Sequence, residues 1–251
     1  MKLRAWAARP TILFAAAYLL NGVLHEASHA IAAIALAVPA VLFQYRVDIR
    51  DEDAAPWEHA VIAAAGPVVS GAFAMICAAA YRHGAGRPGQ LMLLYLAAIA
   101  ALVLFGNMMS PVGDFARMED ALDMPSMARQ VMLAAGFAGL VAALFVAGRE
   151  LRAWFPADVS RAGGIAIFIA APALVGTGIA TLMAQPIPDG FTYARLSESL
   201  VWVVAAIGAW RGRPARAPSP LRPEWHALDA VIVIAAVIAV RGLVRGIILP
   251  A

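Results

Sequence analysis

Two histidines and a glutamate lie within five residues of a long apolar stretch, in "VLHEASHAIAA" at 23–33. On a helix, His25 and His29 would project from one face, one turn apart. That spacing lets two neutral imidazoles bind one zinc ion, and Glu26 is placed to exchange protons with a water molecule there. The H-E-x-x-H pattern therefore predicts a hydrolytic site with one Zn²⁺ per chain. The alternative is three polar packing groups inside a helix bundle, each of which would need partners in lipid.

A catalytic zinc site needs a third protein ligand and one open position. We expect Asp114 to be that ligand, in "FGNMMSPVGDFARMED" at 105–120. Asn107 and Pro111 favour a helix end shortly before it, and a turn there would let the carboxylate reach back to the first helix. Other candidates stay open, namely three acids of the same segment and two histidines at opposite ends of the second apolar run: Glu119, Asp120, Asp123, His59 and His83.

The composition is that of an integral membrane protein. Of 251 residues, 63% are hydrophobic and only 14% are charged, whereas a soluble domain is normally about half apolar and a quarter charged. The net charge of +3 comes from arginines that lie between apolar runs, as loop anchors do, so we expect no nucleic-acid partner. The single cysteine, Cys77, excludes an intrachain disulfide and a cysteine-based metal cluster.

The apolar runs predict an all-α polytopic fold with six or seven transmembrane helices. A spanning helix needs about 20 mostly apolar residues, and long continuous runs favour helices over a barrel. The candidate spans are 11–37, 57–81, 90–112, 127–148, 163–184, 197–210 and 228–249. Basic residues are more frequent on the side that holds the N-terminus, which predicts that this end is cytoplasmic.

A short strand is predicted between the first two helices. In "VLFQYRVDIR" at 41–50, apolar residues that include Phe43 and Tyr45 alternate with more polar ones, which is typical of a half-buried strand. Such a strand could pair with an extended peptide, so Phe43 and Tyr45 are candidate substrate contacts. The alternative is an ordinary amphipathic connector.

Small residues mark the second helix, in "AAAGPVVSGAF" at 63–73. Gly66, Ser70 and Gly71 would let helices approach closely in lipid, and Pro67 would bend the helix. The chemistry-bearing motifs thus fall within residues 1–125. Residues 126–251 contribute further helices of unknown role and a Pro/Arg-rich linker at 211–225.

These motifs resemble the site-2 protease family of intramembrane zinc metalloproteases, and most of all its small bacterial members. The resemblance rests on "HEASH", "AAAGPVVSG" and the "N…P..GD" segment, and it covers roughly residues 15–125. It implies that His25, His29 and Asp114 are zinc ligands, that Glu26 is the catalytic base, and that the 41–50 strand presents substrate. It also implies that Asn107 corresponds to the asparagine before the family's aspartate motif, and that the protein lies in a bacterial inner (cell) membrane.

The chain departs from that family in three ways. Ser28 stands where the family often has glycine, and Phe115 follows Asp114 where glycine is usual. The better-known members place the site toward the cytoplasmic face, whereas the charge distribution here places Asp114 near the external face.

The expected function is zinc-dependent cleavage of a membrane-embedded or membrane-adjacent helix, with a membrane protein or peptide as substrate and the lipid bilayer as surroundings. Two alternatives stay open: a zinc hydrolase of a lipid amide or ester, and a non-catalytic binding protein or transporter. A transporter would carry polar residues along several spans, and the later spans here have few.

Overall fold

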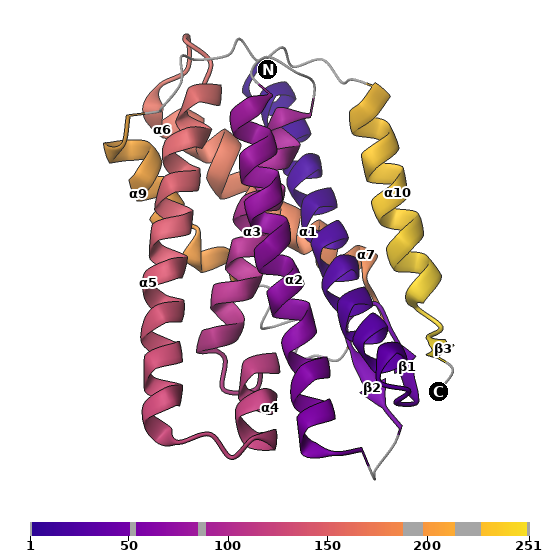
Figure 1. Ribbon diagram of the computed structural model, residues 1–251. Coiled ribbons are helices and arrows are strands. Elements are labelled where there is room, and N and C mark those ends of the chain that lie inside the picture. The colour runs from indigo at the N-terminus through magenta and orange to yellow at the C-terminus, as the bar shows by residue number, and fades with distance from the viewer. Residues whose placement is uncertain (1, 51–53, 85–88, 188–197, 214–226, 250–251) are drawn as a thin grey trace.

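The computed structural model describes residues 2–50, 54–84, 89–187, 198–213 and 227–249, and it is mostly helical (Figure 1). Within these residues, five segments are long and apolar enough to cross a membrane: Ala7–Ala35, Pro56–His83, Gln90–Ala121, Ser126–Trp154 and Arg161–Met183. They correspond to the first five predicted spans. The prediction of a helical membrane protein is therefore confirmed. The predicted linker at 211–225 lies almost entirely outside the described residues.

The helices in chain order are α1 (Lys2–Ala35), α2 (Pro56–His83), α3 (Gln90–Met109), α4 (Asp114–Ala121) and α5 (Ser126–Leu151). A short turn, η1 (Arg152–Trp154), follows α5. The fifth long segment is continuous but includes two π-helical stretches; its parts are α6 (Arg161–Ile165), η2 (Ala166–Ala170), η3 (Pro172–Gly176) and α7 (Thr177–Met183).

The last two predicted spans differ from expectation. In the 197–210 span, residues 198–201 are helical, Trp202 forms a turn, and α9 (Val203–Arg211) follows; the 228–249 span contains α10 (Ala227–Leu243). The prediction of helix to residue 249 was wrong at its end, because Ile247–Leu249 forms a strand, β3. Gly246 separates the two elements with a φ of 76°, a conformation that glycine adopts without strain. Whether six or seven helices cross the bilayer stays a prediction.

The segment after α1 is a hairpin and not the single strand predicted over 41–50. β1 (Ala40–Leu42) pairs antiparallel with β2 (Val47–Ile49). The chain reverses between them, where the Phe43 N–H donates to the Arg46 carbonyl at 2.9 Å. The buried Gln44 amide anchors this turn by donating to the carbonyl oxygens of Ala184 and Pro186. The alternation did not reveal this turn, and the buried side chains are Ala40, Leu42 and Gln44, on the face opposite Phe43 and Tyr45.

β3 completes a small sheet of order β2–β1–β3, with Leu42 opposite Ile247. The sheet joins the C-terminal end of the described chain to the connection between α1 and α2. It packs on a small apolar cluster that includes Ala33, Ile62 and Leu243. β2 is consequently an edge strand.

The helices form a bundle around α1, with the sheet and α4 at the end opposite the N-terminus (Figure 1). One large apolar core joins α1, α3, α5, the 161–183 segment, α9 and α10, and thus spans both halves of the chain. Close helix packing is clearest between α5 and α9, where a Cβ on Gly148 would lie 1.8 Å from the Ala205 carbonyl oxygen.

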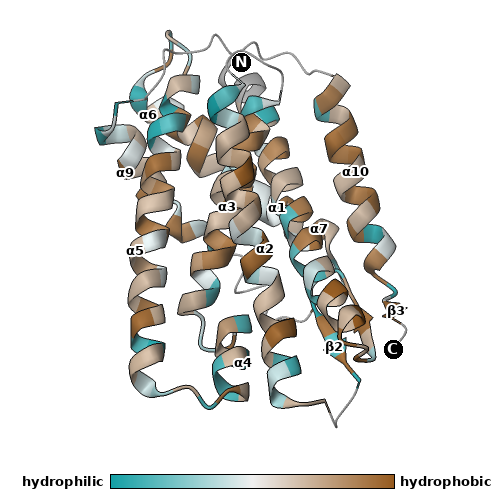
Figure 2. Cartoon of the chain, viewed as in Figure 1, coloured by the Kyte–Doolittle hydropathy of each residue, from teal (hydrophilic) through white to brown (hydrophobic). Residues whose placement is uncertain are grey.

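The outer helix faces are apolar, as expected of a protein surrounded by lipid. Large side chains such as Met75, Phe137 and Ile238 are 70%, 61% and 66% exposed. Figure 2 shows long hydrophobic runs along α5 and α10, with hydrophilic residues at the bundle ends and along part of α1. Polar side chains inside a membrane-spanning helix cost free energy, so the polar residues of α1 are candidates for a functional site.

Candidate metal centre and cleft

The structure brings together the three side chains predicted as zinc ligands. His25 and His29 lie on α1, and Asp114 is the first residue of α4. His25 Nε2 is 3.2 Å from His29 Nε2 and 2.9 Å from Asp114 Oδ2, and His29 Nε2 is 3.5 Å from the same oxygen. They form the one group of three or more His, Cys, Asp or Glu side chains with metal-site spacing among the described residues.

These separations fit a tetrahedral zinc site. Zinc bonds of about 2.0–2.1 Å to nitrogen and oxygen place neighbouring ligand atoms about 3.3 Å apart. The measured separations of 2.9, 3.2 and 3.5 Å lie around that value. Two histidines and one carboxylate are also a donor set that catalytic zinc uses with its fourth position open.

The other ring nitrogens are held by α2. His29 Nδ1 donates to the Ile62 carbonyl oxygen at 2.6 Å, and His25 Nδ1 lies 3.2 Å from Ser70 Oγ. Because the Ile62 carbonyl accepts a proton bound to His29 Nδ1, the lone pair of His29 Nε2 is available to a metal. A hydrogen-bond partner of one ring nitrogen thus selects the tautomer in which the other nitrogen can be a ligand. α2 continues through Pro67, which has no N–H, so the Ala63 carbonyl next to Ile62 receives no helix hydrogen bond from residue 67.

Gly66 lets α2 approach the two imidazoles. A Cβ at this position would lie 2.3 Å from His29 Nε2 and 2.7 Å from His25 Cε1. Any side chain would therefore occupy the place of the rings or of an ion between them. The prediction that small residues on this helix support the site thus has a specific cause at Gly66.

Asn107 positions Asp114. Its Oδ1 accepts the Asp114 backbone N–H at 2.9 Å, and its Nδ2 donates to the Val103 carbonyl. The end of α3 and the start of α4 are thereby joined across the turn at 110–113. Arg117 Nη1 lies 3.9 Å from the other Asp114 oxygen. Asn107 was a candidate for substrate binding or structural support, and these contacts support the structural role.

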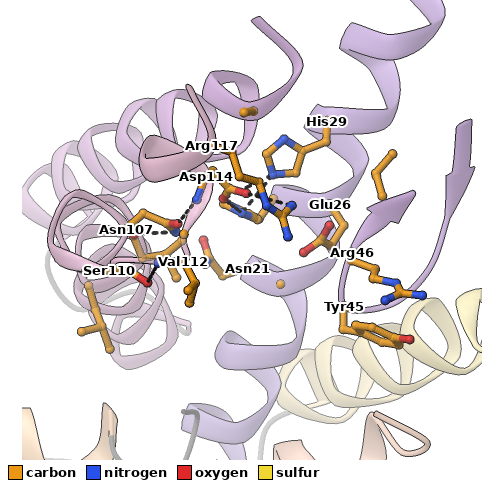
Figure 3. Close-up of a pocket in the computed structure, with 18 of the residues that line it drawn as sticks. Asn21, Glu26, His29, Tyr45, Arg46, Asn107, Ser110, Val112, Asp114 and Arg117 are labelled. Carbon is orange, nitrogen blue, oxygen red and sulfur yellow. Dashed lines mark hydrogen bonds and ion pairs between the residues drawn. The ribbon is translucent and has the colours of Figure 1, made fainter. Parts of the chain in front are cut away.

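The three side chains lie on the wall of a cleft of about 1100 Å³. Glu26, Asn21 and Tyr45 line it, and Figure 3 shows the Glu26 carboxylate and the Asn21 amide in the space beside the three side chains. β2 contributes Val47 and Ile49. The second half of the chain also takes part through Leu140, Glu198 and Val201, so the cleft extends beyond the predicted 1–125 core.

Phe43 and Tyr45, the predicted substrate contacts, differ in position. Tyr45 lines the cleft, whereas Phe43 is absent from its lining. The two rings stack with centroids 6.1 Å apart, and the Arg46 guanidinium lies over both. Phe43 therefore contacts two residues of the cleft lining, Tyr45 and Arg46, without lining the cleft itself.

The competing ligands do not join the three ligand atoms, although Asp120 and His59 line the same cleft. Glu119 and Asp120 pair with Arg129, at 3.4 and 2.7 Å. His59 lines the cleft without joining the three ligand atoms, and His83 ends α2 at its other terminus. Asp123 lies beyond α4 with a φ of 47°.

Sequence reasoning missed two sets of contacts. Ser70 was noted for its small size only, although Ile62, Gly66 and Ser70 follow at intervals of four and so share the α2 face that meets the histidines. Glu198 accepts a hydrogen bond from the Tyr18 hydroxyl within the cleft, and no local pattern links residues 180 positions apart.

No protein-family model, curated protein or solved structure matched this chain.

Proposed function

We propose that this protein is a zinc-dependent membrane endopeptidase that hydrolyses a peptide bond in a membrane-embedded or membrane-adjacent segment. The observation that carries the proposal is the convergence of His25, His29 and Asp114 on one point of a cleft that Glu26 also lines. The motif resemblance to site-2 proteases agrees with this arrangement and gives the substrate class.

The protein side of the chemistry follows from the positions of these groups. Zinc bound here would supply Lewis-acid chemistry and make a water molecule reactive near neutral pH. His25 and His29 direct Nε2 toward that point because Ser70 and the Ile62 carbonyl hold their Nδ1 atoms. The Glu26 carboxylate accepts a proton as the water oxygen bonds to the substrate carbonyl carbon. It returns a proton to the amine nitrogen as the C–N bond breaks.

A peptide fits the cleft better than a lipid because of β2. Val47 and Ile49 place an edge strand in the cleft wall, where an extended peptide can add main-chain hydrogen bonds. A lipid amide or ester would gain nothing from this edge. Incubation of the purified protein with a lipid panel and a peptide panel separates the two substrate classes: cleavage confined to lipids would contradict the proposal.

The proposal is tested with Glu26→Gln in the full chain, purified and reconstituted, with a panel of labelled transmembrane peptides as substrates. We expect cleavage to fall by about 10²- to 10⁴-fold, which is the usual contribution of general acid–base catalysis. Zinc content should stay unchanged because Glu26 is not a ligand. Glu150→Gln, on α5 and outside the cleft lining, is the matched control. Wild-type cleavage by Glu26→Gln would overturn the role of Glu26, and an inactive wild-type protein would overturn the proposed function.

A further inference from the structure

Asn21 is buried in the cleft wall, and no described residue forms a hydrogen bond with its side chain. Its side chain is 1% exposed, and neither the amide nitrogen nor the amide oxygen has a hydrogen-bond partner among the described residues. A buried polar group without a partner lowers stability, so native proteins rarely keep one without a reason. A leucine at this position of the apolar helix would avoid the loss of stability that comes from burying an unpaired amide.

The position of Asn21 suggests the reason. It lies four residues before His25 on α1, and the two share a helix face with His29. Asn21 lines the same cleft as Glu26, and its amide points into it (Figure 3). The other polar side chains of this stripe have partners: Tyr18 donates to Glu198, and the histidines contact α2.

The contrast with Asn107, the other asparagine of the cleft, is informative. Both polar groups of Asn107 are used inside the protein, one by the Asp114 N–H and one by the Val103 carbonyl. Its amide therefore holds the turn before α4. Asn21 also has an amide close in sequence to a predicted zinc ligand, four residues before His25, but neither of its polar groups has a hydrogen-bond partner among the described residues.

The substrate of the proposed reaction needs such a group. A peptide segment unwound inside an apolar cleft has backbone N–H and C=O groups that its own helix no longer satisfies. The β2 edge can pair with groups on one side of an extended segment, but the groups on its other side need a separate partner. A side-chain amide supplies both a donor and an acceptor.

We propose that Asn21 binds the backbone of the unwound substrate, with Nδ2 donating to a peptide carbonyl and Oδ1 accepting a peptide N–H. In this role Asn21 would partner backbone groups of the substrate that the β2 edge leaves unpaired. This inference rests on the proposed peptidase function and adds to it a binding residue that lies outside the H-E-x-x-H motif.

The test replaces Asn21 with leucine, which has similar volume and no polar group. In the full-length protein we expect kcat/KM on the peptide panel to fall about 10- to 100-fold, as for loss of a buried hydrogen-bond partner. Zinc content should be unchanged. The unfolding midpoint should rise, because an unpaired buried amide has been removed. The control is Gln90→Leu, a buried amide that donates to Tyr81 outside the cleft; it should lower stability and leave kcat/KM unchanged.

A binding measurement separates this inference from the proposed function. In the Glu26→Gln background, peptide affinity is measured by fluorescence anisotropy with and without the Asn21→Leu substitution. We expect the substitution to weaken peptide binding about 10-fold, because the peptide loses a hydrogen-bond partner. Unchanged affinity and kcat/KM, or a joint loss of zinc and stability that marks a packing role, would overturn the assignment. If the wild type cleaves no peptide, the proposed function fails while this binding comparison still decides the role of Asn21.

Discussion

Two places in the bundle bury ionisable side chains on α1, and they are built differently. Near the N-terminal end, Arg9 Nε lies 2.8 Å from Asp229 Oδ2 of α10, and the two side chains are 8% and 0% exposed. Near the other end, His25, His29 and Asp114 are also largely buried, but they face a cleft. The first place pairs opposite charges across two helices. The second brings several ligand atoms to one point beside Glu26.

The difference separates a structural role from a functional one. Arg9 and Asp229 are absent from the lining of the cleft, and their pairing joins the first and last helices of the described chain. In each histidine, Nδ1 contacts α2 and Nε2 lies at the point where the predicted ligand atoms converge. Burial of charge in a membrane helix is thus a functional signal only where the groups converge on accessible space.

The largest effect is expected from Asp229→Ala, which leaves the buried Arg9 without this carboxylate. Breaking a buried pair costs about 3–5 kcal/mol of unfolding free energy. Zinc content and activity per folded molecule should not change, because the pair lies outside the cleft. Denaturant unfolding with zinc analysis checks this, with the exposed Asp158→Ala as control. Loss of zinc from the folded Asp229→Ala variant would show that the Arg9–Asp229 pair and the metal centre are not independent.

In contrast to Asp229→Ala, Asp114→Asn should lower zinc affinity strongly and the free energy of unfolding less. Removal of the charged ligand should weaken zinc binding by more than about 100-fold, beyond the loss usual for an outer-shell partner. Competition with a zinc chelator measures this. Asp123→Asn, in the turn after α4, should bind zinc like the wild type. Equal zinc affinities for the two variants would exclude Asp114 as a ligand.

Gly66→Ala tests the close approach of α2. The added Cβ, 2.3 Å from His29 Nε2, must displace the imidazole, and we expect zinc affinity to fall about 10- to 100-fold for an overpacking strain of about 1–3 kcal/mol. Gly178→Ala is the matched control, since a Cβ there meets no atom within 4 Å. The same chelator titration applies. Tight zinc binding by Gly66→Ala would contradict the packing described here.

Ser70→Ala should have the smallest effect. It removes the hydroxyl 3.2 Å from His25 Nδ1, and loss of such an outer contact typically costs about tenfold or somewhat more in metal affinity. Ser28→Ala is the control on α1, because its hydroxyl donates to the Leu24 carbonyl of its own helix. The two zinc dissociation constants should therefore differ, and equal values would show that Ser70 does not orient His25.

Local sequence patterns predicted the helices and the three converging side chains well, because both depend on spacing within short segments. The four-residue interval of His25 and His29 and the helix-ending residues before Asp114 indicated the site. The hairpin was missed because the Gln44 amide bonds to carbonyl groups some 140 positions away. β3 was read as helix because Ile247–Leu249 is apolar in either structure, and only pairing with β1 makes it a strand. The unpartnered state of Asn21 is likewise a property of tertiary structure.

The central claim is that His25, His29 and Asp114 hold one zinc ion, and metal analysis of the purified full-length protein tests it most directly. We expect about one zinc per chain, with X-ray absorption showing nitrogen and oxygen ligands at about 2.0–2.1 Å. A His25→Ala, His29→Ala double variant that still folds should contain almost no zinc. A wild-type protein that binds no zinc, or a double variant that binds as much as the wild type, would contradict the account.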